Sequence, residues 1–115
     1  MPKTNKYPYR ADIHVKLIRT AIEGKTITYA EVGGGRFMLG RYLYRIMREE
    51  RTAWRPPLTA VVVAKRDGRP AEGFLEAMDE IVYLRAGETA EEVWRRALRD
   101  VHEYWRPKEL DQLRG

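Results

Sequence analysis

Apolar side chains recur at helical spacing in two segments of the first half of the chain. Residues 10–23 and residues 36–52 each contain a stripe of apolar positions three or four residues apart, which is typical of amphipathic helices. The first stripe is His14, Leu17, Ile18, Ala21 and Ile22, and the second is Leu39, Leu43, Ile46 and Met47. Gly24 and the pair Pro56-Pro57 are suitable residues to follow the ends of these two helices.

A third and very short helix is predicted between them. Thr28-Tyr29-Ala30-Glu31 is a capping box, in which the threonine hydroxyl bonds a helical N–H and the glutamate reaches back to the threonine amide. Gly33-Gly34-Gly35 is expected to end this helix after about one turn. The order helix, short helix, helix predicts a helix-turn-helix unit over residues 10–55.

The next segment changes to a β pattern. Residues 58–64 are apolar and rich in β-branched side chains, which predicts a strand. Arg66-Asp67-Gly68-Arg69 indicates a tight turn, and residues 72–75 would form the returning strand of a β-hairpin wing over residues 57–76. The apolar run at residues 81–84 is too short for its periodicity to decide, and we expect a strand there as well.

A second capping box, Thr89-Ala90-Glu91-Glu92, predicts the start of a last helix, which Pro107 is expected to end. The predicted fold is therefore α+β: a winged helix-turn-helix with a β-hairpin wing and an additional C-terminal helix at residues 89–105. Residues 10–106 would form this domain, with a flexible basic arm at residues 1–9 and a tail at residues 107–115. The apolar face of the last helix is Val93, Trp94, Ala97, Leu98, Val101 and Trp105.

The composition fits one globular domain and narrows its chemistry. The chain has 115 residues, of which 43% are hydrophobic and 34% charged, and it contains neither cysteine nor serine. Disulfides, thiolate chemistry and a serine nucleophile are thereby excluded. No apolar run approaches the ~18 residues of a membrane span, and the first residues lack the apolar stretch of a signal peptide. We therefore expect a cytoplasmic protein with no membrane partner.

The charge is unevenly distributed along the chain. Residues 1–70 contain 15 basic and 6 acidic side chains, whereas residues 71–115 contain 7 basic and 11 acidic ones. Arg41, Arg45 and Arg48 share one face of the predicted third helix, with Tyr44 beside them. Such a face suits phosphate groups and base edges, and Lys65, Arg66 and Arg69 would add charge at the tip of the wing.

Several of these residues also have a purely structural interpretation. Glu49 and Glu50 could pair with Arg45 or Arg48, which would leave an ordinary solvated face. The Tyr29 hydroxyl could contact a backbone phosphate, or its ring could fill a gap between helices. Trp54 is expected to pack as a lid rather than to offer a stacking surface, and Trp94 and Trp105 are expected to pack in the core or in a dimer.

Several motifs together resemble those of a known family. Thr26-Ile27-Thr28-Tyr29-Ala30-Glu31, then Leu39-Gly40 within an arginine-rich helix, then Asp67-Gly68 and Gly73-Phe74, are similar to the C-terminal domain of alkylguanine–DNA alkyltransferases and alkyltransferase-like proteins. The resemblance covers roughly residues 10–75. It implies a winged helix that grips DNA through the minor groove and extrudes a damaged guanine, with Tyr29 near the target phosphate.

The chain departs from that family at its reactive positions. Ala60 stands where the family has its reactive cysteine, and the catalytic histidine is absent, so alkyl transfer is excluded. Phe37 stands where the family has the arginine that props open the base stack, and Arg36 lies one residue earlier, so either a phenyl wedge or a shifted arginine would take that role. The motif Pro56-Pro57-Leu58-Thr59 with Gly73-Phe74 is also similar to small uncharacterised bacterial domains, which supports the fold and a shared surface around the hairpin.

We therefore predict a non-catalytic duplex-DNA-binding protein without cofactor or metal. A metal nuclease is disfavoured because Val63 stands where such a site needs an acid before Lys65. The alternative is a protein-interaction module, either a homodimer or a binder of another protein, that uses the hairpin and the tryptophan-bearing helix. The predicted DNA-contacting residues are Tyr29, Arg36, Phe37, Arg41, Tyr44, Arg45, Arg48, Lys65, Arg66 and Arg69.

Overall fold

The computed structural model describes residues 7–35, 37–71 and 73–114, with residues 107–114 as backbone only. Helix α1 spans Ala11–Ile22, and helix α3 spans Leu39–Thr52, three residues later than the predicted start. Between them, strand β1 (Ile27–Thr28) leads into the short helix α2 (Tyr29–Val32). The predicted capping box is confirmed, because the Glu31 amide donates to Thr28 Oγ1 at 3.3 Å and the Thr28 amide donates to Glu31 Oε1 at 2.9 Å.

The predicted β-hairpin wing is wrong. Within the predicted strand 58–64, Leu58–Val61 form the 3₁₀ helix η1, and only Val62–Val63 form a strand, β2. This strand pairs in parallel with β1, in the register Ile27 to Val62 and Thr28 to Val63. The predicted returning strand is instead helix α4 (Gly73–Glu80), which follows a loop over residues 64–71. The described residues therefore form a mostly helical fold with a two-stranded parallel sheet, and not a winged helix.

Two physical reasons account for this error. The segment Leu58–Val63 is buried on all sides in the middle of the molecule, so its apolar run reflects its position and not a strand's alternation. In α4 the buried side chains Phe74 and Met78 are four positions apart, which is helical spacing. The turn signal at Asp67-Gly68 favoured a returning strand at residues 72–75, so this spacing was overlooked.

The expected strand at residues 81–84 is also wrong. Here the chain leaves α4 in a turn, in which the Tyr83 amide donates to the Met78 carbonyl at 2.8 Å. Val82 has a positive φ of 64°, a conformation that β-branched residues rarely adopt and that interrupts a strand.

The last helix, α5, spans Ala90–Arg114. Its predicted capping box is confirmed, since the Thr89 amide donates to Glu92 Oε1 at 2.9 Å and the Glu92 amide donates to Thr89 Oγ1 at 3.2 Å. The predicted end at Pro107 is wrong, because the helix continues beyond it. The residues after Pro107 are mostly strong helix formers, which favours continuation even though the proline removes one hydrogen bond.

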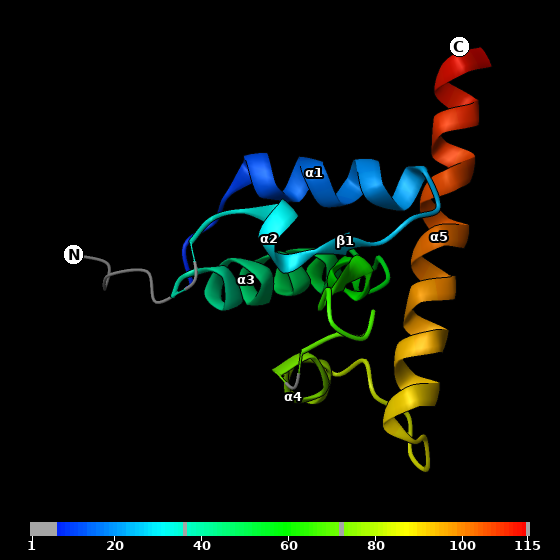
Figure 1. Ribbon diagram of the computed structural model, residues 1–115. Helices are drawn as coiled ribbons and strands as arrows, with labels where there is room; N and C mark the ends of the chain where they lie inside the picture. The colour runs from blue at the N-terminus through cyan, green and yellow to red at the C-terminus, as the bar shows by residue number, and fades with distance from the viewer. Residues whose placement is uncertain (1–6, 36, 72, 115) are drawn as a thin grey trace.

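Helices α1, α3 and α5 surround the buried segment η1–β2. In Figure 1, α1 and α3 run side by side and α5 stands across one end of them. Leu58, Ala60 and Val61 are completely buried at the centre of this arrangement. Trp94 packs against this core and donates from its indole nitrogen to the Ala60 carbonyl at 3.0 Å, and Trp105 also packs against it, so the core packing expected of both is confirmed.

A fully buried carboxylate joins α1, α3 and the segment that follows α3. Glu50 accepts a hydrogen bond from Arg55 Nε, and its Oε1 lies 3.2 Å from His14 Nε2. His14 Nδ1 in turn lies 2.6 Å from the Tyr9 hydroxyl oxygen. Because a buried charge without partners is costly, this cluster fixes α3 in position against α1.

None of the described helices has the length and apolar character needed to cross a membrane.

Candidate nucleic-acid interface

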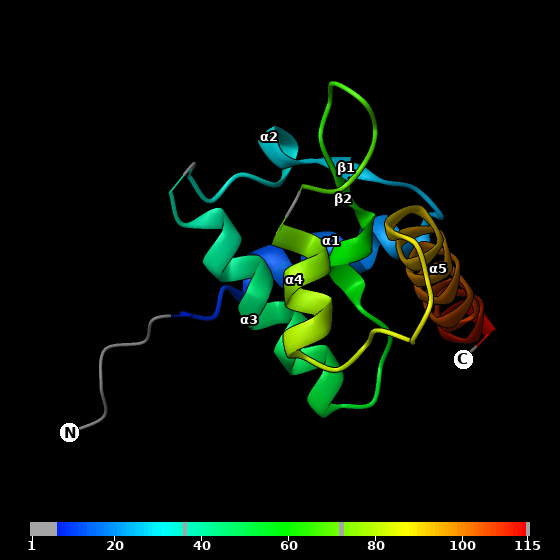
Figure 2. The ribbon, with the colours of Figure 1, turned by 90° about the horizontal axis from the view of Figure 1, so that it is seen from below.

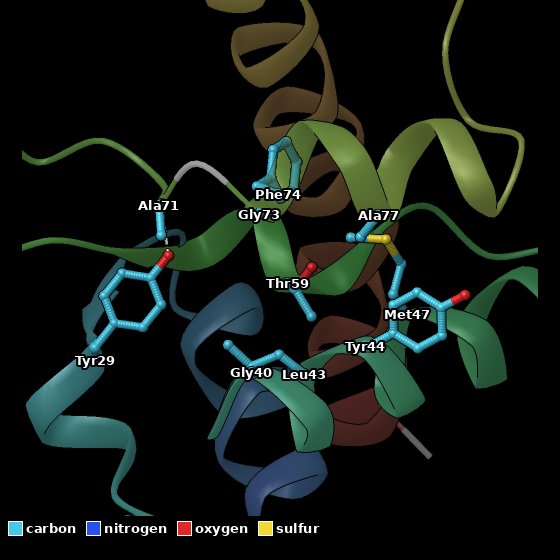
Figure 3. Close-up of a pocket in the computed structure, with 10 residues that line it drawn as sticks. All are labelled: Tyr29, Gly40, Leu43, Tyr44, Met47, Thr59, Ala71, Gly73, Phe74 and Ala77. Carbon is cyan, nitrogen blue, oxygen red and sulfur yellow. Dashed lines mark hydrogen bonds between the residues drawn. The ribbon is translucent and has the colours of Figure 1, made fainter. Parts of the chain in front are cut away.

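A cavity of about 140 Å³ opens between α2, α3, η1 and α4. Figure 3 shows the phenol ring of Tyr29 at one end of it and that of Tyr44 at the other. The remaining walls are apolar or backbone. The lining residues are Tyr29, Gly40, Leu43, Tyr44, Met47, Thr59, Ala71, Gly73, Phe74 and Ala77.

Two glycines leave this cavity open on the helices that form its walls. A Cβ atom added to Gly40 of α3 or to Gly73 of α4 would meet no other atom within 4 Å. Any larger side chain on either helix at these positions would therefore occupy free space. Both glycines line the cavity, and neither contributes a side chain that would narrow it.

The cavity offers few polar groups. Thr59 is buried, and its hydroxyl has no hydrogen-bond partner among the described residues. A buried polar group in this condition is uncommon in proteins, and a ligand in the cavity could supply its partner. At the opposite wall the Tyr29 hydroxyl accepts a hydrogen bond from the Ala71 amide at 2.6 Å, which ties α2 to the end of the 64–71 loop. Burial raises the pKa of this phenol, so Tyr29 remains a neutral donor.

The tyrosine at the other end of the cavity is held from two sides. The Glu80 carboxylate of α4 accepts a hydrogen bond from Tyr44 and raises the pKa of its phenol. The ring of Tyr7 stacks on the ring of Tyr44, with centroids 4.4 Å apart. Of the predicted arm at residues 1–9, the part from Tyr7 onward thus lies against α3, and residues 1–6 lie outside the described residues.

The arginines on α3 and just beyond its end divide into two groups. Arg45 donates to Glu49 Oε2 at 2.8 Å and to the Tyr7 carbonyl at 3.1 Å, and Arg55 is bound to Glu50, so the molecule itself neutralises both. Arg41 and Arg48 are exposed and form no ion pair with any carboxylate that the structure describes. Arg48 lies over the Tyr44 ring, with its guanidinium carbon 6.0 Å from the ring centroid. The solvated-face interpretation therefore holds for Arg45 but not for Arg48.

The basic residues predicted for a wing lie on the 64–71 loop instead. Figure 2 shows this loop beside β1 and α2, projecting from the body of the molecule. Lys65, Arg66 and Arg69 are all exposed on it. Two of them form ion pairs near the surface, Arg66 with Asp67 at 3.8 Å and Arg69 with Glu91 of α5 at 3.4 Å. Such exposed pairs are weak, so both guanidinium groups can still meet a phosphate.

The glycine loop between α2 and α3 carries Phe37 at its end. This side chain is 89% exposed, which is unusual for a phenylalanine, and it directly precedes the first turn of α3. Arg36 lies outside the described residues. Gly34 has a φ of +91°, and a Cβ atom there would lie 2.9 Å from Ile13 Cδ1, so the loop requires glycine at this position.

The sequence analysis named nine of the described residues as DNA contacts but missed the cavity that Tyr29 and Tyr44 line. Thr59 and Phe74 were assigned to strands, so their convergence on one cavity with Tyr29 and Tyr44 could not be predicted. The signal that could have revealed it is the pair Gly40 and Gly73, because glycine inside or at the start of a helix often marks a close approach or an open space.

Comparison of the chain with protein-family models, with curated proteins and with solved structures finds no match.

Proposed function

We propose that the protein binds duplex DNA without catalysing a reaction, through the face that surrounds the cavity. This cavity face is defined by the exposed groups Phe37, Arg41, Arg48, Lys65, Arg66 and Arg69. The observation that carries the proposal is that Arg41 and Arg48, on the helix that forms one cavity wall, have no carboxylate partner among the described residues. Unpaired guanidinium groups on a rigid helix can neutralise phosphates and release the counterions that surround DNA.

The cavity is proposed to receive one extruded base. Two aromatic rings and apolar walls suit the faces of a planar base, and the Thr59 hydroxyl could bond to its edge. At about 140 Å³ the cavity is smaller than the roughly 300–1,000 Å³ of sites for drug-sized ligands, so it suits a single ring system. We also propose that the exposed phenyl ring of Phe37 enters the base stack. The chain contains no cysteine, so no thioether bond to the base would form.

The alternative function, a protein-interaction module, depended on a β-hairpin and on two tryptophans exposed along the last helix, and neither feature is found in the described residues. The hairpin is absent from the described fold, and Trp94 and Trp105 pack against the protein's own core. Helix α5 therefore does not present these two indoles as a free surface.

The direct test is fluorescence anisotropy with a labelled duplex of about 20 base pairs at several salt concentrations. Five exposed cations on the cavity face predict a slope of log K against log salt of about −4.5, since each neutralised phosphate contributes about −0.9. Affinity should fall by roughly 500-fold between ~50 and ~200 mM salt. Absence of binding at ~50 mM salt, or binding that salt does not weaken, would contradict the proposal.

Filling the cavity should remove any preference for a base that is easily extruded. A mismatch lowers the unpairing free energy by a few kcal/mol at most, so we expect the protein to bind a duplex with one mismatch about tenfold more tightly than a paired one. Gly40→Leu should abolish this difference because its side chain enters the cavity, and Gly40→Ala should preserve it. The measurement is anisotropy with both duplexes. Equal mismatch preference in the two variants would rule out the cavity as the base site.

A further inference from the structure

The most exposed indole of the described chain lies immediately beyond the end of α3. Trp54 is 83% exposed, so the expectation that it packs as a lid is wrong. Its φ of 59° places it in the left-handed conformation that normally follows a helix as glycine. Its amide donates to the Arg51 carbonyl at 3.0 Å, and the next amide, of Arg55, donates to the Glu50 carbonyl at 2.9 Å.

This placement is unfavourable in the isolated protein for two reasons. A large side chain at positive φ is strained, and glycine at the same position would relieve the strain. An exposed indole also forgoes the free energy of burial that tryptophan usually gains. Trp54 makes no contact with the hydrophobic core that would offset either cost. A binding partner that covers the indole would explain why tryptophan stands at this position.

Trp54 extends a row on α3 in which two arginines lie between two aromatic side chains. We define the α3 row as Tyr44, Arg48, Arg51 and Trp54. The guanidinium carbon of Arg51 lies 4.6 Å from the Trp54 ring centroid and 5.9 Å from that of Tyr83, and Arg48 lies over Tyr44. From position 44 to position 54 a helical rise of about 1.5 Å per residue gives a row about 15 Å long.

We propose that the α3 row binds a single-stranded nucleic-acid segment that continues from the duplex on the cavity face, with a base stacked on Trp54. This inference rests on the proposed function, because Tyr44 belongs both to the cavity and to the row. Aromatic faces spaced among guanidinium groups are the surface that unpaired bases and their phosphates recognise. In a continuous duplex the base faces are covered by their neighbours, so only an unpaired base can use an exposed indole.

The charges around the row favour a polyanion over a protein surface. Neither Arg48 nor Arg51 forms an ion pair among the described residues, so both can meet phosphates. The exposed carboxylates of α4, Glu76, Asp79 and Glu80, limit the row on its α4 side. The phosphates would therefore follow the side of α3 that carries Arg41 and Arg48.

The test compares a blunt duplex with the same duplex extended by six unpaired thymidines on either the 3′ or the 5′ strand. One of the overhangs should raise the affinity of the unmodified protein about tenfold, since stacking of a single base on an aromatic ring gives a gain of this order. Trp54→Gly should abolish that gain, and Trp54→Phe should retain part of it. Trp54→Gly is the decisive variant because glycine suits the backbone at this position, so loss of binding cannot be attributed to misfolding.

Val82→Gly is the matched control. Val82 is another apolar residue at positive φ, 71% exposed, and its replacement should leave the overhang gain unchanged. An overhang gain that persists in Trp54→Gly, or that Val82→Gly removes equally, would overturn the inference. So would salt-dependent binding of the blunt duplex with no gain from either overhang, or a Trp54→Gly effect confined to self-association of the protein.

The outcomes separate this inference from the proposed function. Binding of the overhang probes without binding of the blunt duplex would refute the duplex proposal and support the α3 row. Failure of every probe to bind at ~50 mM salt would refute both.

Discussion

Replacing Glu50 with alanine is expected to destabilise the protein by about 3–5 kcal/mol, the range for removing one partner of a buried ion pair. The side chain of Glu50 is fully buried and is held between His14 of α1 and Arg55. Its removal leaves the Arg55 guanidinium and the His14 ring without their acceptor and creates a cavity in the core. For a domain of this size, thermal unfolding should shift down by roughly 12 °C or more.

The neighbouring residue provides a control on the same helix. Glu49 pairs with Arg45 near the surface, where an exposed pair contributes about 1 kcal/mol or less, so Glu49→Ala should change stability little. Glu50→Gln should fall between the two, because it retains the shape and one acceptor oxygen. Circular dichroism with heat and urea would measure all three variants. Similar losses for the two alanine variants would show that the buried cluster does not stabilise the fold.

The sequence predicted the helices whose apolar periodicity is complete. The stripes of α1 and α3 face the core, with Leu17, Ala21 and Ile46 fully buried, and both capping boxes form at the predicted residues. These signals are local, because each depends on residues within one or two helical turns. These helices could therefore be predicted without knowing how the elements pack together.

The errors arose where tertiary position decides the local structure. The run Leu58–Val63 was interpreted as a strand because of its β-branched residues, whereas burial from three helices allows a 3₁₀ turn and a two-residue strand. Once that segment was assigned to a hairpin, residues 72–75 were assigned to its partner strand. The helical spacing of Phe74 and Met78 in α4 was then overlooked.

The candidate interface could be predicted only in part, because tertiary contacts decide which of its arginines are free. Helical spacing correctly placed Arg41 and Arg48 on one exposed face of α3, but it could not show which arginines the protein itself neutralises. Glu50 lies four positions after Ile46 and three after Met47, so its place on the buried stripe was available in the sequence. The partners of Arg45, in contrast, include the Tyr7 carbonyl, which is 38 residues away along the chain and could not be predicted.

Reversing the charge of Arg41 and Arg48 together is expected to weaken duplex binding about 100-fold at ~50 mM salt, if both contact phosphates. Two attractive contacts would be lost and two repulsive ones introduced, and the slope of log K against log salt should become less steep by about two. Both side chains are exposed and lack carboxylate partners among the described residues, so the fold should be unaffected, with stability changed by about 0.5 kcal/mol or less. Anisotropy and thermal unfolding of Arg41→Glu/Arg48→Glu would measure the two effects separately.

The matched control changes the net charge by the same amount elsewhere. Arg19 on α1 and Arg99 on α5 are exposed and lie outside the cavity face, so Arg19→Glu/Arg99→Glu should act on DNA only through long-range repulsion. Salt screens such repulsion over about 10 Å at 0.1 M, so the expected loss is about threefold or less at that salt concentration. If both double variants weakened binding equally, the attraction to DNA would depend on the net charge of the molecule. A loss confined to Arg41→Glu/Arg48→Glu would instead locate the contact at the helix that forms the wall of the cavity.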